Sequence, residues 1–487
     1  MTRRSFGVTF AAAASRALSQ QSGAGDFHVS PEAGDAGDGT PAKPWSLGRA
    51  LSAVDLIRPG ATVWLHGGAY TGHFDCRLAG SEEKPIVIRP YPGHAVLIDA
   101  KGESAGALVV SGPWTVFRDL EITDSDPDRT ATRPPGVSVL GPHTNLVNLV
   151  IHDCGIGIGF WTNCLGPAAV YGCLIYHNGW QGAPPDRGHG HAIYSQNREG
   201  IKRLADNIMF NQFSFGIHAY GTQAAFLKGF DIEGNISFNN GSLSRGRAFT
   251  SNILVGGDTP AEHIVLRENL TYFDKPGNSI RLGYNAANRD AIVHDNYIVG
   301  TAQIELWEKM EFTRNTVVSG GPLLRLSESP ASPAAGPWED NNYVQLDAQR
   351  SPFEISKAGW NFAQWRQRGH RDAHSRLRSG RPDGPRVFVR PNRYEPGRAH
   401  VAVCNWDGAS AVPVDLAGVL HSGQSFEVLC AQDYFGAPAL RGVYSGKPVQ
   451  LPMTPRTPTQ PVGVVPCPPG PTGPEFEVFV VRSVQPI

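Results

Sequence analysis

Polar side chains of four chemical types recur at one position of a repeated apolar segment in the middle of the chain. Each segment is centred on an isoleucine, such as Ile193 or Ile217. If these isoleucines point inward, the residues that follow them point outward. The outward residues are Tyr194, His218, Leu254, Arg281 and Glu305. A phenol, an imidazole, a guanidinium and a carboxylate on one face can bind an acidic group and transfer protons. We therefore predict that the four polar members are catalytic.

A second outward column lies two positions further along each segment. It contains Gln196, Tyr220, Gly256, Gly283 and Trp307, and Trp161 extends it toward the N-terminus. The glycines leave room for a ligand, and the aromatic rings could stack on sugar rings. With neighbouring polar and aromatic positions included, the predicted substrate-binding residues are Trp161, Asp186, Arg187, Gln196, Tyr220, Tyr284, Trp307 and Glu308.

A loop rich in glycine and histidine, Trp180 to His191, precedes the segment that contains Tyr194. Its glycines let the backbone and the imidazoles approach a ligand closely. We predict that His189 and His191 act in acid–base catalysis or contact the substrate. Together with His218 they could also bind zinc, copper or iron. No fourth ligand is evident, so we predict neither a metal nor another cofactor.

The elements that position these residues form an imperfect repeat, in which an Asn or Asp precedes alternating apolar residues. Examples are Asn148-Leu149-Val150-Ile151 and Asn269-Leu270-Thr271-Tyr272. Successive units are 19 residues apart between Asn296 and Asn315 and 34 apart between Asn235 and Asn269. Periods of this length indicate a solenoid.

Two further strand-like runs accompany each unit, which makes three strands per turn and predicts a right-handed parallel β-helix. Each short strand must stack on its neighbours, at about 4.8 Å, to satisfy its backbone. We expect the corner asparagines, from Asn148 to Asn342, to adopt the left-handed conformation and form a hydrogen-bonded ladder. The stacking distance is close to the length of a sugar unit, so an outward face of the coil suits a polysaccharide.

The flanks of the coil follow other patterns. Residues 1–25 contain Arg3-Arg4 and a short run of small residues, typical of a twin-arginine export signal. The coil is predicted at 26–350, with a short helix from Leu47 to Leu56 that caps its open end. A helical linker at 351–384 and an antiparallel β-sandwich at 385–487 follow, so the predicted chain is all-β.

Composition narrows the function further. The chain has 487 residues, 56 glycines, 39 prolines and a formal net charge of −1, which gives no basis for binding nucleic acid. No run approaches the roughly 20 apolar residues needed to span a membrane. Seven cysteines leave one local disulfide open among Cys154, Cys164 and Cys173. We expect an exported monomer, periplasmic or extracellular.

The chain resembles the pectate-lyase-like superfamily, which includes pectate lyases, alginate lyases, mannuronan epimerases and polygalacturonases. The resemblance rests on the repeat, the entry segment at 29–72 and the histidine-rich loop followed by Tyr194. Lyases and epimerases remove the proton beside a uronate carboxylate, which needs a cation, a base and often a tyrosine. The resemblance implies Arg281 as the cation, His218 or His189 as the base, and Tyr194 as the acid. The aspartates that bind calcium in pectate lyases are absent from the outward columns.

We therefore predict an exported enzyme that acts on an acidic polysaccharide by β-elimination or C5 epimerisation. One alternative is a glycoside hydrolase that uses Glu305 with Glu308 or Asp186, because such enzymes need two carboxylates about 5 Å or about 6.5–9.5 Å apart. Another is a polysaccharide-binding surface protein without catalytic activity.

Overall fold

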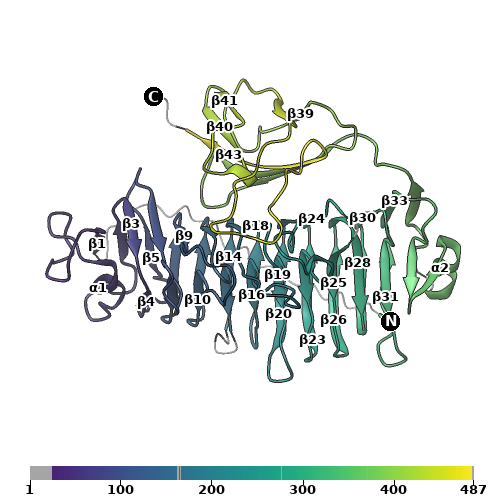
Figure 1. The fold of residues 1–487 in the computed structure, drawn as a ribbon, viewed down its shortest axis with the longest axis horizontal. Coiled ribbons are helices and arrows are strands. Elements are labelled where there is room, and N and C mark those ends of the chain that lie inside the picture. Colours follow the sequence, from purple (N-terminus) through teal and green to yellow (C-terminus); the bar gives the residue numbers. More distant parts are fainter. Residues whose placement is uncertain (1–24, 162–163, 165, 276, 370, 485–487) are drawn as a thin grey trace, which may run out of the picture.

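The computed structural model describes residues 25–484, except 162–163, 165, 276 and 370. Apart from Gly25, the predicted export signal lies outside these residues. The described chain forms a long coil of three twelve-stranded sheets and a smaller C-terminal unit on one side of it (Figure 1). Each turn contributes one strand to each sheet in the order sheet 1, sheet 2, sheet 3. The predicted right-handed parallel β-helix is confirmed.

The strands of the coil are short, mostly three to seven residues. Sheet 1 contains β1 (Asp26–Val29), β2 (Thr62–Leu65), β5 (Ile86–Pro90), β8 (Thr115–Arg118), β11 (Asn145–Val147), β14 (Ala168–Tyr171), β17 (Lys202–Ala205), β20 (Leu227–Glu233), β23 (Ala261–Arg267), β26 (Asn288–His294), β29 (Trp307–Thr313) and β32 (Trp338–Glu339). Sheet 2 contains β3 (Gly68–Thr71), β6 (Val96–Asp99), β9 (Glu121–Thr123), β12 (Val150–His152), β15 (Leu174–Tyr176), β18 (Ile208–Phe210), β21 (Ile236–Phe238), β24 (Leu270–Tyr272), β27 (Tyr297–Val299), β30 (Thr316–Ser319), β33 (Asn342–Gln345) and β36 (Arg376–Ser379). Sheet 3 contains β4 (Phe74–Cys76), β7 (Leu108–Val110), β10 (Val137–Val139), β13 (Ile158–Phe160), β16 (Ile193–Ser195), β19 (Ile217–Ala219), β22 (Ile253–Val255), β25 (Asn278–Leu282), β28 (Thr301–Glu305), β31 (Leu324–Ser327), β34 (Phe353–Ile355) and β35 (Ala358–Trp360), which alone runs antiparallel.

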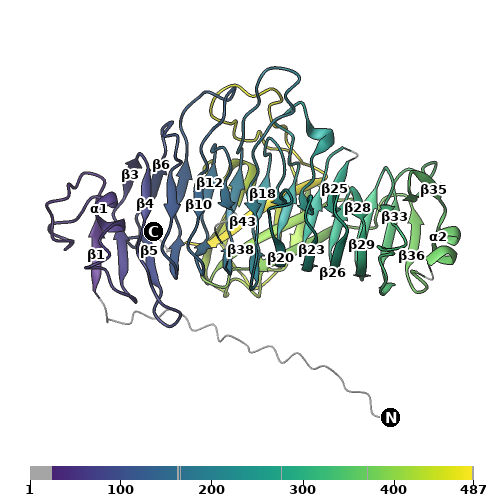
Figure 2. The same cartoon turned by 90° about the horizontal axis from the view of Figure 1, so that it is seen from below.

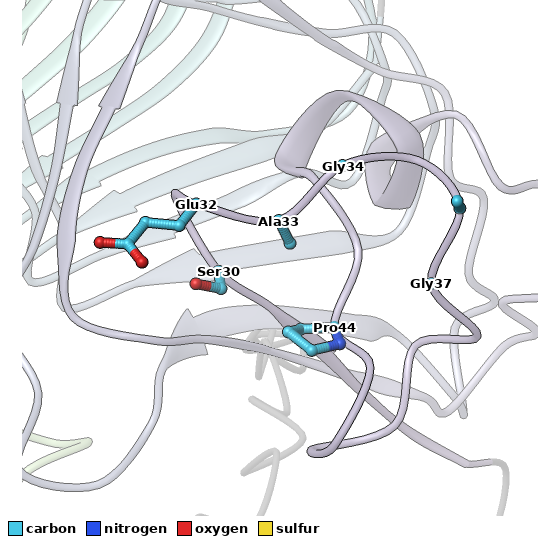
Figure 3. Close-up of a pocket in the computed structure, with 7 residues that line it drawn as sticks. Ser30, Glu32, Ala33, Gly34, Gly37 and Pro44 are labelled. Atoms are coloured by element: carbon cyan, nitrogen blue, oxygen red, sulfur yellow. The ribbon is translucent and has the colours of Figure 1, made fainter.

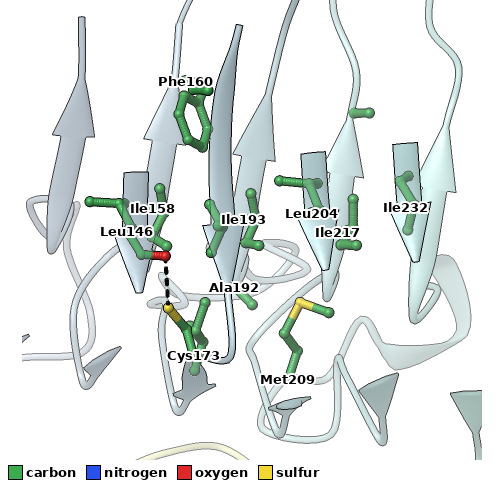
Figure 4. Packing of buried hydrophobic residues seen from close by; sticks show 14 of the residues in the cluster. Leu146, Ile158, Phe160, Cys173, Ala192, Ile193, Leu204, Met209, Ile217 and Ile232 are labelled. Atoms are coloured by element: carbon green, nitrogen blue, oxygen red, sulfur yellow. Dashed lines mark hydrogen bonds between the residues drawn. The ribbon is translucent and has the colours of Figure 1, made fainter. Parts of the chain in front are cut away.

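The interior of the coil is filled by aliphatic side chains from all three sheets. Ile158, Ile193 and Ile217 from successive turns of sheet 3 lie beside one another, facing Leu204 and Ile232 of sheet 1 (Figure 4). All three isoleucines are fully buried. This packing fixes which residues of sheet 3 point outward, because neighbouring side chains of a strand point to opposite faces. All seven cysteines are free thiols, so the local disulfide left open by the sequence does not form.

An asparagine ladder runs along the corner before sheet 2, as predicted, but its members differ in part from the expected ones. Its members are Asn207, Asn235, Asn269, Asn296, Asn315 and Asn341. Each side-chain amide donates to the Oδ1 of the next at 2.9–3.3 Å. Asn148, outside the ladder, has the expected left-handed conformation with φ of +54°, but along the ladder this conformation belongs to the residue before each member, with φ from +54° to +65°. Each ladder asparagine therefore follows the turn residue, and its side chain is buried. At the C-terminal end the ladder residue is Asn341 and not the predicted Asn342.

Both ends of the coil are capped. Helix α1 (Leu47–Leu51) covers the first turn and is shorter than the predicted helix to Leu56. At the other end the coil continues past residue 350, because β34 and β36 still pair with their sheets. The predicted linker therefore contains the last turn, and within it helix α2 (Phe362–Gly369) buries Trp365 against the end of the coil.

The C-terminal unit consists of a five-stranded antiparallel sheet and a two-stranded one that share a core. The larger sheet contains β37 (Arg386–Pro391), β38 (Arg398–Cys404), β43 (Phe476–Ser483), β40 (Ser425–Cys430) and β41 (Leu440–Val443); the smaller contains β39 (Ala411–Val414) and β42 (Val449–Pro452). Two 3-10 turns, η1 (Arg247–Phe249) and η2 (Ala431–Asp433), complete the elements. The larger sheet packs on the outer face of sheet 2, where Phe476 stacks on Tyr272 with ring centroids 4.2 Å apart. The C-terminal unit therefore leaves the outer face of sheet 3 uncovered.

Among the described residues, no helix is long and apolar enough to span a membrane.

Candidate functional site

The outer face of sheet 3 carries the predicted column of polar residues. Tyr194 pairs directly with His218, His218 with Leu254, and Leu254 with Arg281. The column is therefore confirmed from Tyr194 to Arg281. It places an imidazole and a guanidinium on one face with only Leu254 between them.

The predicted position of Glu305 in this column is wrong. The register shifts within β25, so that Ile280 pairs with Ala302 and Arg281 pairs with Gln303. Ile304 remains inward because a shift of two residues preserves the alternation of faces. Glu305 still reaches back, and its Oε2 accepts a hydrogen bond from Arg281 Nε at 2.6 Å.

Trp307 and Glu308 were predicted to contact substrate, and the structure contradicts this for Trp307. Leu306 adopts the left-handed conformation, with φ of +56°, and turns the chain into β29 of sheet 1. Trp307 is consequently fully buried and donates from Nε1 to the carbonyl of Leu282 at 3.0 Å. Glu308 lies on sheet 1, where it forms an ion pair with Arg289.

A cleft of about 280 Å³ lies on the outer face of sheet 3 around Arg281, and we name it the Arg281 cleft. It is lined by Arg187, Phe215, His218, Tyr220, Ala248, Phe249, Thr250, Ser251, Leu254, Asn278, Arg281, Tyr284 and Gln303. The loop before β16 supplies Arg187, and the loop before β22 supplies four residues from Ala248 to Ser251. No carboxylate is among the described residues that line the cleft.

Arg281 is held in a fixed position. Its Nε donates to Glu305, and its guanidinium lies over the ring of Tyr284 at 4.3 Å from the centroid. Within the described chain, its terminal nitrogens make no hydrogen bond. These nitrogens are therefore available for a carboxylate in the cleft, which a guanidinium binds through two parallel hydrogen bonds.

His218 lies between two aromatic rings and is bonded to a second histidine. Its ring is nearly parallel to those of Phe215 and Tyr220, with centroids 4.2 Å and 4.9 Å away. Its Nδ1 lies 3.0 Å from Nε2 of His191. The backbone N–H of Phe215 donates to Nδ1 of His191 at 3.3 Å.

This chain of hydrogen bonds fixes the tautomers of both histidines. Burial lowers the pKa of His191 to about 3 and the pKa of His218 well below its usual value, so both rings are neutral. Because Nδ1 of His191 accepts from a backbone N–H, the proton of His191 lies on Nε2 and is donated to Nδ1 of His218. The proton of His218 then lies on Nε2, the remaining ring nitrogen. His218 therefore presents an N–H donor to the cleft rather than a base.

Tyr194 lies beside the cleft, one turn before His218. Its hydroxyl accepts a hydrogen bond from Nε2 of Gln196 at 2.8 Å, and burial raises its pKa. Its ring contacts Trp161 at a centroid distance of 4.9 Å and meets the His218 ring edge-on at 5.6 Å. Tyr194 and Gln196 thus support the aromatic face, and Tyr220 and Tyr284 are the tyrosines that line the cleft.

The glycine- and histidine-rich loop divides its polar residues between two places. Arg187 lines the cleft, whereas His189 forms an ion pair with Asp186 at 2.9 Å and stacks on Trp180. Burial alone would raise the pKa of Asp186, but the N–H groups of Gly182 and Gly188 and the His189 ring hold it below its usual value. His189 is therefore not brought to the cleft. The described residues contain no group of three or more histidine, cysteine or acidic side chains arranged to hold a metal ion.

Seven cleft residues were not predicted from the sequence: Phe215, Ala248, Phe249, Thr250, Ser251, Asn278 and Gln303. Phe215 belongs to a loop whose path the repeat does not determine. Asn278 and Gln303 bond to each other at 2.6 Å across the shifted register of β25 and β28. Of these residues, only Gln303 could have been predicted from the sequence. It precedes the inward Ile304 as Glu305 follows it, so both side chains point outward.

A separate pocket of about 320 Å³ lies in the N-terminal segment between Ser30 and Pro44 (Figure 3). Among the described residues that line it, Glu32 alone is ionisable, and its carboxylate points away from Pro44. No predicted site residue lines this pocket. The Arg281 cleft, which gathers four of them besides Arg281 itself, is the better candidate site.

The likeness of this chain to known proteins is local in sequence and distant in structure. No protein-family model matches the chain. A stretch of 80 residues, 16% of the chain, is 36% identical to the pectate lyase PEL9 of Emericella nidulans and spans 19% of that protein's length. This local match confirms the predicted resemblance to the pectate-lyase-like superfamily.

Similar solved structures include a pectate lyase, with 16% identity and a TM-score of 0.43 over 69% of this chain and 80% of its own. A lacto-N-biosidase of Eubacterium ramulus has 15% identity and a TM-score of 0.45, over 73% of this chain and 67% of its own. The A-module of a mannuronan C-5 epimerase of Azotobacter vinelandii has 14% identity and a TM-score of 0.40, over 69% of this chain and 95% of its own.

Proposed function

We propose that the protein is an exported enzyme that binds an acidic polysaccharide in the Arg281 cleft and removes the proton at C5 of a uronate. β-Elimination is the leading outcome, and C5 epimerisation is the outcome if the proton returns on the opposite face. The observation that carries this proposal is the fixed Arg281 guanidinium, which shares one cleft with the His218 Nε2–H and two tyrosines.

In the proposed reaction Arg281 and His218 bind the uronate carboxylate. Their donors stabilise the negative charge that spreads onto this carboxylate when the C5 proton leaves. Tyr284, whose ring lies under the Arg281 guanidinium, takes that proton on its phenol oxygen and releases its own hydroxyl proton to solvent. Tyr220 donates its proton to the departing oxygen, consistent with a pKa raised by burial. The C5–H and C4–O bonds break and a C4–C5 double bond forms.

The absence of carboxylates from the described lining of the cleft favours this reaction over glycoside hydrolysis, which needs two. Of the carboxylates considered from the sequence, Glu305 is bound to Arg281, Glu308 lies on sheet 1, and Asp186 is paired with His189. None of the three lines the cleft.

The proposal is tested on a panel of uronate and neutral polysaccharides, with ultraviolet absorbance and new reducing ends measured together. Unsaturated uronate with new reducing ends supports β-elimination, whereas reducing ends without absorbance would contradict it. Replacing Arg281 by Gln should lower the rate by about 10²–10³-fold, because one charge-stabilising donor is lost. Arg289→Gln, which removes a guanidinium from sheet 1, is the matched control and should keep the full rate.

A further inference from the structure

A cavity lies beside Trp161, on the N-terminal side of the Arg281 cleft. We name it the Trp161 pocket; its volume is about 470 Å³. Its main lining residues are Trp161, Trp180, Asp124, Asp126, Asp128 and Arg133. They come from the loops that lead from sheet 2 into β10 and β16 and from the residue after β13.

The pocket offers aromatic surface that is continuous with the cleft. Trp161 is 36% exposed. Its indole lies against the backbone of Gly159, where an added Cβ would come within 2.9 Å of Nε1. Trp161 contacts Tyr194, and Tyr194 contacts His218. A chain of sugars bound in the cleft therefore meets Trp161 if it extends toward the N-terminal end of the coil.

The charges of the pocket are opposite to those of the cleft. The guanidinium of Arg133 is engaged by protein groups: it forms an ion pair with Asp124 at 3.2 Å and donates to the carbonyls of Asp126 and Asp128 at 2.7 and 2.6 Å. The carboxylates of Asp126 and Asp128 have no cationic partner among the described residues. The hydrogen bonds of Thr130 hold the pKa of Asp128 below its usual value, so this carboxylate is charged at neutral pH. The cleft, by contrast, presents Arg187 and Arg281.

The spacing separates the two sites by about two sugars. Trp161 follows β13, and β13 is two strands from β19, which carries His218. Two turns at about 4.8 Å place the pocket about 10 Å from the imidazole.

We propose that the Trp161 pocket is a second sugar-binding site that accepts a neutral or amino sugar and rejects a uronate. Its tryptophans stack on the sugar ring, and the carboxylates of Asp126 and Asp128 accept hydrogen bonds from hydroxyl or ammonium groups. A uronate there would place its carboxylate beside two others. The substrate is then a heteropolysaccharide in which uronates are separated by other sugars. This inference rests on the proposed function of the Arg281 cleft.

The test compares the binding of two probes by calorimetry. One is hexagalacturonate, in which every sugar is acidic. The other is an oligosaccharide from gellan, whose glucuronates are separated by neutral sugars. We expect the wild-type protein to bind the gellan fragment at least about tenfold more tightly, which corresponds to one unfavourable charge contact. Equal affinity for both probes would overturn the inference.

Variants assign the preference to the pocket. In D126N/D128N, hexagalacturonate should bind more tightly, so that the preference falls below about threefold. Asp347→Asn is the matched control, because it removes an exposed carboxylate at the far end of the coil. This variant should keep the wild-type ratio of the two affinities. An unchanged ratio in D126N/D128N would overturn the inference. Trp161→Ala should weaken the gellan fragment about tenfold, and Trp161→Phe, which keeps a ring, should restore part of that loss.

The variant R281Q distinguishes failure of the proposed function from failure of the second sugar-binding site. If R281Q binds both probes as tightly as the wild type does, the Arg281 cleft does not bind a uronate and the proposed function fails. If R281Q loses binding of both probes but D126N/D128N keeps the wild-type ratio, the cleft stands and only the second site fails. The thermal unfolding midpoint of each variant shows whether it has folded.

Discussion

At the scale of single residues, the neighbours of His218 decide its chemistry. Considered alone, His218 on an outward strand position is equally suited to donate or to accept a proton. The backbone N–H of Phe215 orients the proton of His191, and His191 orients the proton of His218. His191 is thus a positioning residue, and the imidazole in the cleft is a donor.

This assignment predicts a spectroscopic signature. In ¹⁵N-labelled protein at pH 6, the long-range ¹H–¹⁵N spectrum should show His218 neutral and protonated at Nε2, because its pKa lies well below the usual value. His191→Phe removes the donor to Nδ1 and should lower activity by about 10²-fold, the scale of a lost proton-transfer or orienting group. His191→Gln, which retains an N–H donor, should keep more activity. A His218 protonated at Nδ1, or charged at pH 6, would contradict the assignment.

At the scale of elements, stacked strands determine both the groove and the stability. The column from Tyr194 to Arg281 was predictable because each strand repeats one inward isoleucine at the same place. The position of Glu305 was not predictable, because a shift by two residues leaves the alternation unchanged and is invisible in the pattern. Trp307 was wrongly placed in the groove because the left-handed turn at Leu306 moves it into another sheet. The His191–His218 bond depends on loop paths that no repeat encodes.

The asparagine ladder should contribute measurably to stability. Asn269 donates to Oδ1 of Asn296 and to the carbonyl of Ile232, and its own Oδ1 accepts from Asn235. Asn269→Ala leaves these buried partners unsatisfied and should lower the free energy of unfolding by about 2–4 kcal/mol. Asn342→Ala, at an exposed neighbour of the ladder, should change it by less than about 0.5 kcal/mol. Urea denaturation measures both, and similar losses would contradict the ladder.

A buried lysine makes the coil sensitive to pH. Lys202 points inward from β17, donates to the carbonyl of Gln196 at 2.8 Å, and has a pKa lowered by burial from 10.5 to about 8. The unfolded chain binds this proton more tightly than the folded chain, so the free energy of unfolding should rise as pH increases from about 8 to about 10.5. Lys202→Met removes the buried charge but also the hydrogen bonds to Gln196 and Cys164, and should stabilise the protein at pH 7 by about 1–2 kcal/mol. The gain in the free energy of unfolding over the wild type should be larger at pH 7 than at pH 10. A gain that is larger at pH 10 would contradict this account.

At the scale of the whole molecule, the C-terminal unit covers one sheet and supports the loops of another. Its larger sheet buries the outer face of sheet 2. Its long proline-rich loop runs beside the loops of the coil (Figure 2). In this loop the carbonyl of Val462 accepts a hydrogen bond from Arg129, and the N–H of Cys467 donates to the carbonyl of Leu243. Leu243 belongs to the loop before β22, which also supplies the residues from Ala248 to Ser251 that line the cleft.

Removal of the C-terminal unit should therefore affect both solubility and binding. A chain that ends at Gly380 would expose the apolar face of sheet 2 that contains Phe238 and Tyr272. We expect such a chain to bind a hydrophobic dye and to aggregate, because exposed apolar patches of this kind associate. A monomeric truncated protein with wild-type polysaccharide affinity would show instead that the unit is dispensable.

The central claim, that the Arg281 cleft removes the C5 proton of a uronate, is tested most directly by ¹H NMR of an acidic polysaccharide incubated with the enzyme in D₂O. The account predicts either the vinyl proton of an unsaturated uronate or replacement of the C5 proton by deuterium, and neither signal with R281Q. New reducing ends in a polymer whose C5–H signals are unchanged would contradict it.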